Sequence, residues 1–487
     1  MFTSVAEELG KPVPDFVNIR EFAGWSEDKG TLPKMAALLR MATESGTAAR
    51  SLTLTSNGRC LIYADGARGN GVEAAMELAG ALKDSLGVTV MITNAGDDIM
   101  ASGDSGMLTR GTIRKASGHF TAFDLMIDGF ASASPSSRSF VTFDEPQDDI
   151  ESGCDLIIDI TGGTPLFTGW EKRDGYLHAE DSLRLKGLAA EAAEMIGDFE
   201  KPIYVDYDAD LCAHSRNSLN GCSRCLDVCP AGAITAAGDT VAIDPAICGG
   251  CGYCGAVCPS GAAQTVVPAA DMFGQQIATM LDHYLEAGGK TPRLLLADET
   301  HGAQVIEMMA RFGSGLPADM LPMTMHSVGR VGHDLLVTAV AQGYEQVVVI
   351  INPAKTDDTT HITAQIALAR ALMEGVGADD EARFLVIDEA DPDKVAEQLR
   401  GGRPKKSPKP APFSPIGSPR GITRLAMRGL AGAQNVGDAA IPLPDGAPYG
   451  RVEIDTDNCT ICLSCVSACP AGALQDNPDA PQLLFRE

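Results

Sequence analysis

Cysteine spacing constrains the fold of this 487-residue chain more than any other feature. Twelve of its fourteen cysteines fall into three short runs, namely Cys212, Cys222, Cys225 and Cys229; Cys248, Cys251, Cys254 and Cys258; and Cys459, Cys462, Cys465 and Cys469. The second and third runs read C-x2-C-x2-C-x3-C-P, the bacterial pattern for [4Fe–4S] clusters. Because these clusters select thiolate ligands, the runs predict small cluster-bound domains and electron transfer as the leading function.

The first two runs predict one closed pair of clusters. In two-cluster ferredoxins the fourth cysteine of a run ligates the other cluster. The predicted ligand sets are therefore Cys212, Cys222, Cys225 and Cys258 for one cluster, and Cys248, Cys251, Cys254 and Cys229 for the other. The first run is irregular, and its insertion AHSRNSLNG at 213–221 is expected to loop out beside the cluster. His214 is a rival to Cys212 as a ligand, or a group that supports the ligands.

The third run lacks such a complement. The pattern V-x-I-D-x3-C occurs at 241–248 and again at 452–459, which marks a second ferredoxin module. Cys229 precedes Cys248 by 19 residues, and the same step from Cys469 falls just past the last residue. We therefore expect a chain that lacks the last half of a ferredoxin, so that Cys459, Cys462 and Cys465 have no usual fourth ligand. Alternatively, Cys469 closes one cluster locally.

Zinc is the competing metal for any group of four cysteines. Zinc sites usually combine two well-separated C-x2-C pairs, whereas these runs place three cysteines within seven residues, followed by Cys-Pro. Iron is therefore the favoured metal for the cysteines of all three runs, with two confident [4Fe–4S] clusters and a third possible.

Charge and hydropathy narrow the class of partner and the compartment. The formal net charge is −27, which argues against nucleic acid as a partner because phosphates would be repelled. The first residues show no secretory signal, and no stretch approaches the roughly 20 apolar residues of a membrane span. We therefore expect a cytoplasmic protein without membrane insertion, in a compartment that keeps thiols reduced.

Strand-like and helix-like segments alternate on both sides of the first two runs. Strands are expected at 60–65, 88–94, 154–161, 202–208, 293–298, 347–351 and 384–388, and helices at 72–86, 180–197, 302–313, 361–375 and 391–400. Such alternation predicts parallel sheets. The expected fold class is a multidomain α/β protein with two doubly wound parallel-sheet domains flanking a 2[4Fe–4S] ferredoxin-like module, plus a partial C-terminal ferredoxin module.

The predicted domains follow from these patterns. They are an N-terminal arm at 1–50 with one helix near 31–43, an α/β domain at 51–208, the two-cluster ferredoxin module at 209–268, a flavodoxin-like α/β domain at 269–400, a Pro-rich basic linker at 401–448, and the partial ferredoxin module at 449–487. Proline-rich sequence of the linker type is expected to be extended or disordered.

Other signals are weaker. Gly-rich loops at 64–75 and 160–170 could cradle a phosphate, but their spacing is not G-x-G-x-x-G and plain βα turns are favoured. Cys60 and Cys154 are expected to be buried apolar residues. Three histidines have no metal-ligand spacing, namely His301, His326 and His333. We find no catalytic constellation.

The segments at 207–234 (YDADLCAHSRNSLNGCSRCLDVCPAGAI) and 248–263 (CGGCGYCGAVCPSGAA) resemble a family of bacterial 4Fe–4S binding proteins associated with formate dehydrogenase. The C-terminal CTICLSCVSACPAGALQDNPDAPQL at 459–483 shares the resemblance, and in that family it is followed by another cysteine run. Residues 292–400 look like the delta-subunit domain of methyl-viologen-reducing hydrogenase, but they contain no cysteine. The resemblance implies an electron carrier for a redox partner such as formate dehydrogenase.

Three functions stay open from the sequence. The leading one is an electron-transfer protein or oxidoreductase subunit, which we favour over a free-standing enzyme. In the second, an α/β domain binds a flavin or nucleotide and the protein is a subunit of a true oxidoreductase. In the third, the protein is an assembly factor for a metalloenzyme.

Overall fold

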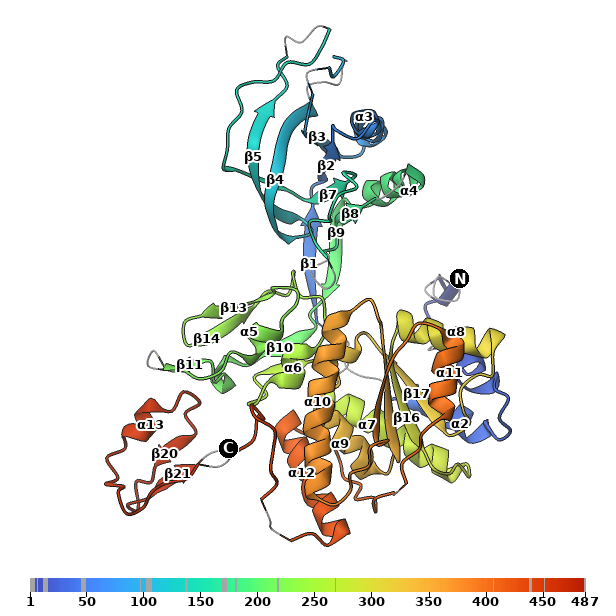
Figure 1. The fold of residues 1–487 in the computed structure, drawn as a ribbon, viewed down its shortest axis with the longest axis vertical. Helices are drawn as coiled ribbons and strands as arrows, with labels where there is room; N and C mark the ends of the chain where they lie inside the picture. Colours follow the sequence, from blue (N-terminus) through green and yellow to red (C-terminus); the bar gives the residue numbers. More distant parts are fainter. Residues whose placement is uncertain are drawn as a thin grey trace.

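The structure, a computed structural model, describes residues 5–6, 8–11, 16–44, 50–96, 98–101, 107–135, 139–168, 173–179, 182–216, 219–267, 269–405, 407–437, 440–450 and 452–485. The protein is mixed α/β with several sheets (Figure 1). An upper domain stands on a narrow neck above a larger body, and a small C-terminal domain lies at the lower left of Figure 1.

The upper domain is built on a seven-stranded sheet with the order β6-β5-β4-β3-β2-β7-β8. Its strands are β2 (Arg59–Asp65), β3 (Gly87–Thr93), β4 (Leu108–His119), β5 (Ala122–Ser132), β6 (Ile150–Cys154), β7 (Leu156–Asp159) and β8 (Tyr176–His178). Helices α3 (Gly71–Leu82) and α4 (Ser182–Ala193) pack against each other, which places both on one face of the sheet.

This sheet differs from an all-parallel one at one edge. Strands β4, β5 and β6 form antiparallel pairs, while the other neighbours are parallel. Buried and exposed positions alternate along much of β5. That alternation suits an antiparallel strand that has one face on the core and one face in solvent. Strands β5 and β6 can therefore extend the sheet without a helix to cover their solvent face.

The neck is a two-stranded antiparallel ribbon. Strand β1 (Ser51–Ser56) pairs with β9 (Gly197–Pro202), from Ser51 opposite Pro202 to Ser56 opposite Gly197. The chain therefore enters and leaves the upper domain through adjacent strands.

The lower body contains a four-stranded parallel sheet with the order β17-β16-β18-β19. Its strands are β16 (Arg293–Asp298), β17 (Met320–Met325), β18 (Gln346–Ile351) and β19 (Phe384–Asp388). Along β16, Leu294 and Leu296 enter one apolar core, while Leu295 and Ala297 enter the other. Both faces of this sheet are therefore buried.

Helices cover each face of that sheet. The core of Leu295 is closed by α8 (His301–Phe312) and α11 (Pro392–Arg400). Three helices cover the core that contains Leu294, namely α7 (Ala270–Glu286), α9 (His333–Gln342) and α10 (Thr356–Gly375).

Two segments outside the predicted α/β domain join the same core. From the expected N-terminal arm, the π-helix η1 (Arg20–Gly24) packs on α8, and α2 (Leu32–Met41) packs on α7. From the expected linker, α12 (Pro419–Gln434) packs on α9. Helix α12 follows the N-cap Ser418 and buries Ile422, Ala426 and Leu430, which are spaced four residues apart on one face. This part of the expected linker is therefore a packed helix and not an extended segment.

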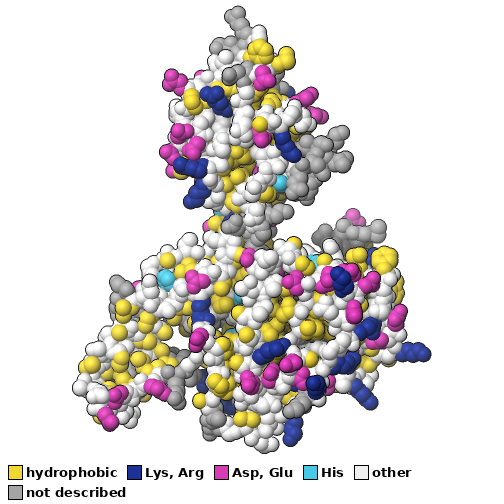
Figure 2. All heavy atoms as spheres, viewed as in Figure 1, with side chains coloured by type: hydrophobic (Ala, Val, Ile, Leu, Met, Phe, Trp, Pro, Cys, Tyr) yellow, Lys and Arg dark blue, Asp and Glu magenta, His cyan; other side chains and the backbone are white. Residues whose placement is uncertain are grey.

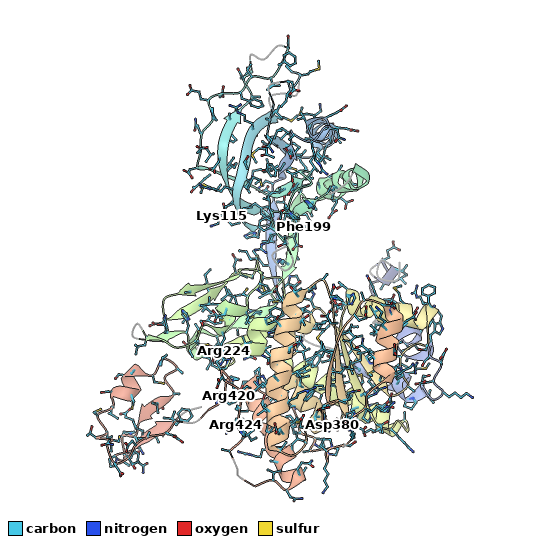
Figure 3. The ribbon with its side chains drawn as sticks, in the orientation of Figure 1. Lys115, Phe199, Arg224, Asp380, Arg420 and Arg424 are labelled. Atoms are coloured by element: carbon cyan, nitrogen blue, oxygen red, sulfur yellow. The ribbon has the colours of Figure 1, made fainter. Side chains whose placement is uncertain are left out.

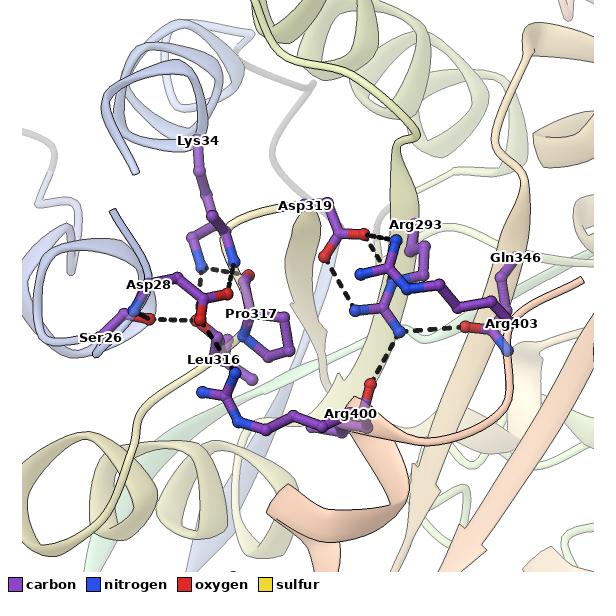
Figure 4. A network of polar contacts seen from close by, with 12 residues as sticks. Ser26, Asp28, Lys34, Arg293, Leu316, Pro317, Asp319, Gln346, Arg400 and Arg403 are labelled. Atoms are coloured by element: carbon purple, nitrogen blue, oxygen red, sulfur yellow. Dashed lines mark hydrogen bonds and ion pairs between the residues drawn. The ribbon is translucent and has the colours of Figure 1, made fainter. Parts of the chain in front are cut away.

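Polar contacts fix the N-terminal arm to the loop before β17 and to the end of α11 (Figure 4). Lys34 Nζ donates to the carbonyl oxygens of Leu316 (3.3 Å) and Pro317 (2.8 Å). Arg400 donates to Asp28 at 3.0 Å. Because Lys34 is fully buried, these carbonyl contacts replace the water that its amine would otherwise bind.

None of the helices in the described residues combines the length and apolar character that a membrane crossing requires.

Candidate iron–sulfur centres

The first two cysteine runs lie in a small module with almost no conventional core. Strand β10 (Val205–Tyr207) pairs with β15 (Ala263–Thr265), and β13 (Ile234–Ala237) forms a hairpin with β14 (Thr240–Ile243). Two one-turn helices, α5 (Arg224–Val228) and α6 (Tyr253–Val257), pack together. The apolar cluster of this module is small, and five of the cysteines pack against it: Cys212, Cys225, Cys229, Cys248 and Cys258.

The electrostatic surroundings of Cys225 identify its neighbours. Burial raises the pKa of the Cys225 thiol to about 11. The charges that raise this pKa further belong to three other cysteines, namely Cys258, Cys222 and Cys212. These four residues are one of the ligand sets expected from the sequence.

A second group surrounds Cys254. Burial raises its pKa well above the usual value, and the next contributions come from Cys251, Cys248 and Cys229, followed by Cys225 of the first group. Burial also raises the pKa of Cys251 to about 12. Thiols in such surroundings ionise only when a cation compensates, which is what metal binding supplies.

Both groups have the donors that a [4Fe–4S] cluster takes. Each contains four cysteine sulfurs, and the backbone N–H of Ala263 donates to Cys258 Sγ at 3.4 Å. Hydrogen bonds of this kind tune cluster potentials. Within the described part of the chain, no three His, Cys, Asp or Glu side chains are close enough to hold a single metal ion.

The insertion in the first run folds back on itself. Strands β11 (Ser215–Arg216) and β12 (Leu219–Asn220) pair, and the N–H of Gly221 donates to the His214 carbonyl at 2.8 Å. His214 is buried, and its Nδ1 lies 2.8 Å from the Cys222 carbonyl oxygen. The turn thus brings the chain after Cys212 back to Cys222.

The second run is held against the lower α/β domain. His326, in the loop after β17, places Nε2 at 3.0 Å from the Gly249 carbonyl and stacks on Tyr204 at 4.8 Å. Gly252 has φ +85°, and a Cβ atom there would lie 2.6 Å from Arg330 Cβ. Only glycine fits this backbone and this approach.

Tyr253 continues that interface. Its hydroxyl donates to the buried carboxylate of Asp358, and its ring stacks on His361 at 4.3 Å. Burial lowers the pKa of His361 to about 4. The carboxyl ends of the parallel strands, where α/β domains usually bind ligands, therefore contact the cysteine loop.

A cavity of about 650 Å³ opens beside this interface. Cys229 and Tyr253 line it from the ferredoxin module, and Lys355, Thr356 and His361 line it from the amino end of α10. Among the described residues, His361 Nε2 has no hydrogen-bond partner.

The third run is far more exposed. It surrounds the one-turn helix α13 (Ser464–Ala468) and precedes a hairpin of β20 (Leu474–Asp476) and β21 (Leu483–Phe485). Cys459, Cys462 and Cys465 are exposed, whereas Cys469 is half-buried. Figure 2 shows hydrophobic side chains gathered over this domain, and five of its large ones are exposed: Val452, Ile454, Ile461, Leu484 and Phe485.

The remaining sequence candidates lie apart from the cysteine runs. Cys60 and Cys154 are buried in the upper sheet, and burial raises the pKa of each to about 12. The two Gly-rich loops meet, because Arg68 Nη1 donates to the Thr161 carbonyl at 3.2 Å. Residues 169–170 of the second loop lie outside the described residues.

The three histidines of the lower domain have separate surroundings. His301 Nε2 lies 3.4 Å from the Glu389 carbonyl oxygen, and His333 Nε2 lies 2.6 Å from the Tyr449 hydroxyl. His326 contacts the second cysteine run through Gly249. That contact depends on the packing of two domains, and no local sequence signal marks it.

Two family models match the chain. The model for a 4Fe-4S dicluster domain matches residues 220–262, and the model for a 4Fe-4S binding domain matches residues 452–475. Cys212 lies outside the first match. A comparison with curated proteins returned no match. The chain therefore contains two ferredoxin-type 4Fe–4S domains, which support iron–sulfur electron transfer.

Proposed function

We propose that the protein is an electron carrier with two [4Fe–4S] clusters in the 212–258 module, each completed by the fourth cysteine of the other run. The observation that carries this proposal is the proximity of cysteines across the two runs: helices α5 and α6, which carry Cys225 and Cys254, pack together. Cys258 is among the cysteines that act on Cys225, and Cys229 is among those that act on Cys254. A bound [4Fe–4S] cluster would take up and release one electron.

The partner and compartment are part of the same proposal. The resemblance of 207–263 to formate-dehydrogenase-associated proteins supports a formate dehydrogenase, or a related oxidoreductase, as the partner. Twelve cysteines that must stay reduced to bind iron support the cytoplasm.

Anaerobic purification followed by iron and sulfide analysis and a dithionite titration tests the proposal. We expect reversible reduction at ferredoxin-like potentials, with EPR signals of reduced [4Fe–4S] clusters. Clusters that assemble but do not reduce reversibly would count against a carrier and favour an assembly factor.

Binding of a flavin or nucleotide is a second candidate function. The supporting observation is the cavity beside Cys229, whose volume lies within the usual range for small-molecule sites. Lys355 and the amino end of α10 line it, and helix amino ends favour anions such as phosphate, while Asp227 and Asp357 add negative charge to the same lining. Flavin absorbance in the supernatant after acid release of the clusters would support this candidate, and its absence would contradict flavin binding.

A further inference from the structure

The C-terminal domain contacts the 212–258 module beside a cysteine of the first run. A Cβ atom added at Gly221 would lie 2.5 Å from Pro470 Cβ and 3.0 Å from Pro470 Cγ. Gly221 immediately precedes Cys222, and Pro470 immediately follows Cys469. Because consecutive Cα atoms are about 3.8 Å apart, the Cα atoms of Cys222 and Cys469 are separated by at most about 13 Å.

A strap at residues 441–449 leads the chain to this position. Ile441 packs on Gly375, where a Cβ atom would lie 2.5 Å from its side chain. At the other end, the Tyr449 hydroxyl lies 2.6 Å from His333 Nε2. The chain is thus fixed to the lower α/β domain three residues before Val452.

Two arginines from different elements, both labelled in Figure 3, donate hydrogen bonds to the strap. Arg224, between Cys222 and Cys225, donates to the Gly446 carbonyl. Arg420, on α12, donates to the Pro448 carbonyl at 3.0 Å and lies over the Tyr449 ring at 5.3 Å. The strap therefore connects the first cysteine run with the α/β domain.

Exposure shows which face of the C-terminal domain is held. In the repeated V-x-I-D pattern, Val241 is 3% exposed but its counterpart Val452 is 47% exposed. Cys469 is the least exposed cysteine of its run. Cys469 and Pro470 are half-buried, as are residues 472–475 after them, whereas residues 452–462 are exposed.

From these contacts we infer that the C-terminal 4Fe–4S domain docks its Cys469-Pro470 turn on the first cysteine run, which makes this domain the intramolecular electron partner of the site at Cys212, Cys222, Cys225 and Cys258. The inference rests on the proposed electron-transfer function and adds the order in which electrons pass between the cluster sites. The second run, covered by the α/β domain, is then the more distant site from the C-terminal domain.

The test uses the full chain with Pro470→Asp, which places a charge in the Gly221 contact. Pro478→Asp is the matched control, since Pro478 is exposed in the β20–β21 turn of the same domain. Cys462→Ser supplies the reference state in which the C-terminal cluster is removed. Hydrogen–deuterium exchange of residues 219–225 and EPR of the dithionite-reduced protein are the readouts.

We expect Pro470→Asp to raise exchange at 219–225 at unchanged iron content. It should also remove the part of the magnetic broadening of the first-site EPR signal that Cys462→Ser removes, while the broadening from the second cluster of the 212–258 module stays. Pro478→Asp should match the wild type in both readouts. Wild-type exchange and broadening in Pro470→Asp would overturn the inference, as would a chain that binds iron only in the 212–258 module.

Two further results separate the possible failures. If the 212–258 module itself does not reduce reversibly, the proposed function fails, whereas reversible reduction without broadening defeats the docking alone. If Pro470→Asp loses iron or secondary structure, Arg420→Ala decides, because it loosens the strap without touching a cysteine run. Wild-type broadening and exchange in Arg420→Ala would then also overturn the inference.

Discussion

The buried amine of Lys34 makes the attachment of the N-terminal arm depend on pH. Burial lowers the pKa of Lys34 from 10.5 to about 7, although the charges of Asp28 and Asp319 oppose this shift. In the unfolded chain the amine keeps its ordinary pKa. Between pH 7 and about 10 the unfolded state therefore binds more protons than the folded state, and stability rises with pH.

The size of the effect follows from the shift. The full difference in pKa corresponds to about 5 kcal/mol, and raising the pH from 7 to 9 should recover about 2 kcal/mol of it. Below pH 7 the amine is protonated in both states, so this contribution stops changing. Lys34→Met should remove the slope, and it also leaves the carbonyls of Leu316 and Pro317 without this donor.

Urea unfolding of the arm at pH 7, 8 and 9 measures the slope. Trp25 is a suitable probe, because it lies beside the network and Arg20 covers its ring at 4.6 Å. A Trp170→Phe background leaves Trp25 as the single tryptophan. Lys29→Met, an exposed lysine on the same arm, is the control and should keep the wild-type slope. Equal slopes in the wild type and Lys34→Met would refute the reasoning.

Three other predictions concern the cysteine module. If the ligands are crossed, Cys258 and Cys222 bind the same cluster, so the double variant Cys258→Ser/Cys222→Ser should lose no more iron than Cys258→Ser alone. The double variant Cys258→Ser/Cys251→Ser should lose a second cluster. The reverse pattern of iron contents would show uncrossed ligation. Gly252→Val should release the second run from Arg330 and lower iron retention, while Gly238→Val, also at positive φ but in open space, should cost only about 1–2 kcal/mol in thermal unfolding. Tyr253→Phe keeps the ring on His361 but removes a donor to buried Asp358, so denaturant unfolding should show a loss of about 1–3 kcal/mol; an unchanged midpoint would contradict that hydrogen bond.

Local pattern was enough to find the buried parallel strands. The strands expected at 293–298 and 347–351 match β16 and β18, because continuous apolar runs mark strands buried on both faces. Strand β17 was not predicted, since Pro322 interrupts its apolar sequence. Its position at the edge of the sheet explains why proline is tolerated there.

Long-range packing is what the sequence could not supply. The helix expected at 31–43 corresponds to α2, but nothing local indicates that it packs on α7, more than 200 residues later. The crossed ligand sets were expected from spacing alone and stay a proposal. The contact of His326 with the second run, and that of Pro470 with Gly221, depend on domain packing and have no sequence signature.

The insertion of the upper domain between two parts of one core has a consequence for synthesis. Lys34 and Pro317 are 283 residues apart, and the 51–202 domain is made between them. At 5–20 residues per second, a ribosome needs roughly 14–57 s to supply the acceptor after the lysine has been added. During that interval the arm has no site, so its lysine stays hydrated and charged while the upper domain is free to fold. Closure of the lower domain is therefore a late event in the life of the nascent chain, and burying Lys34 then strips the hydration water from its amine and, above about pH 7, also releases its proton.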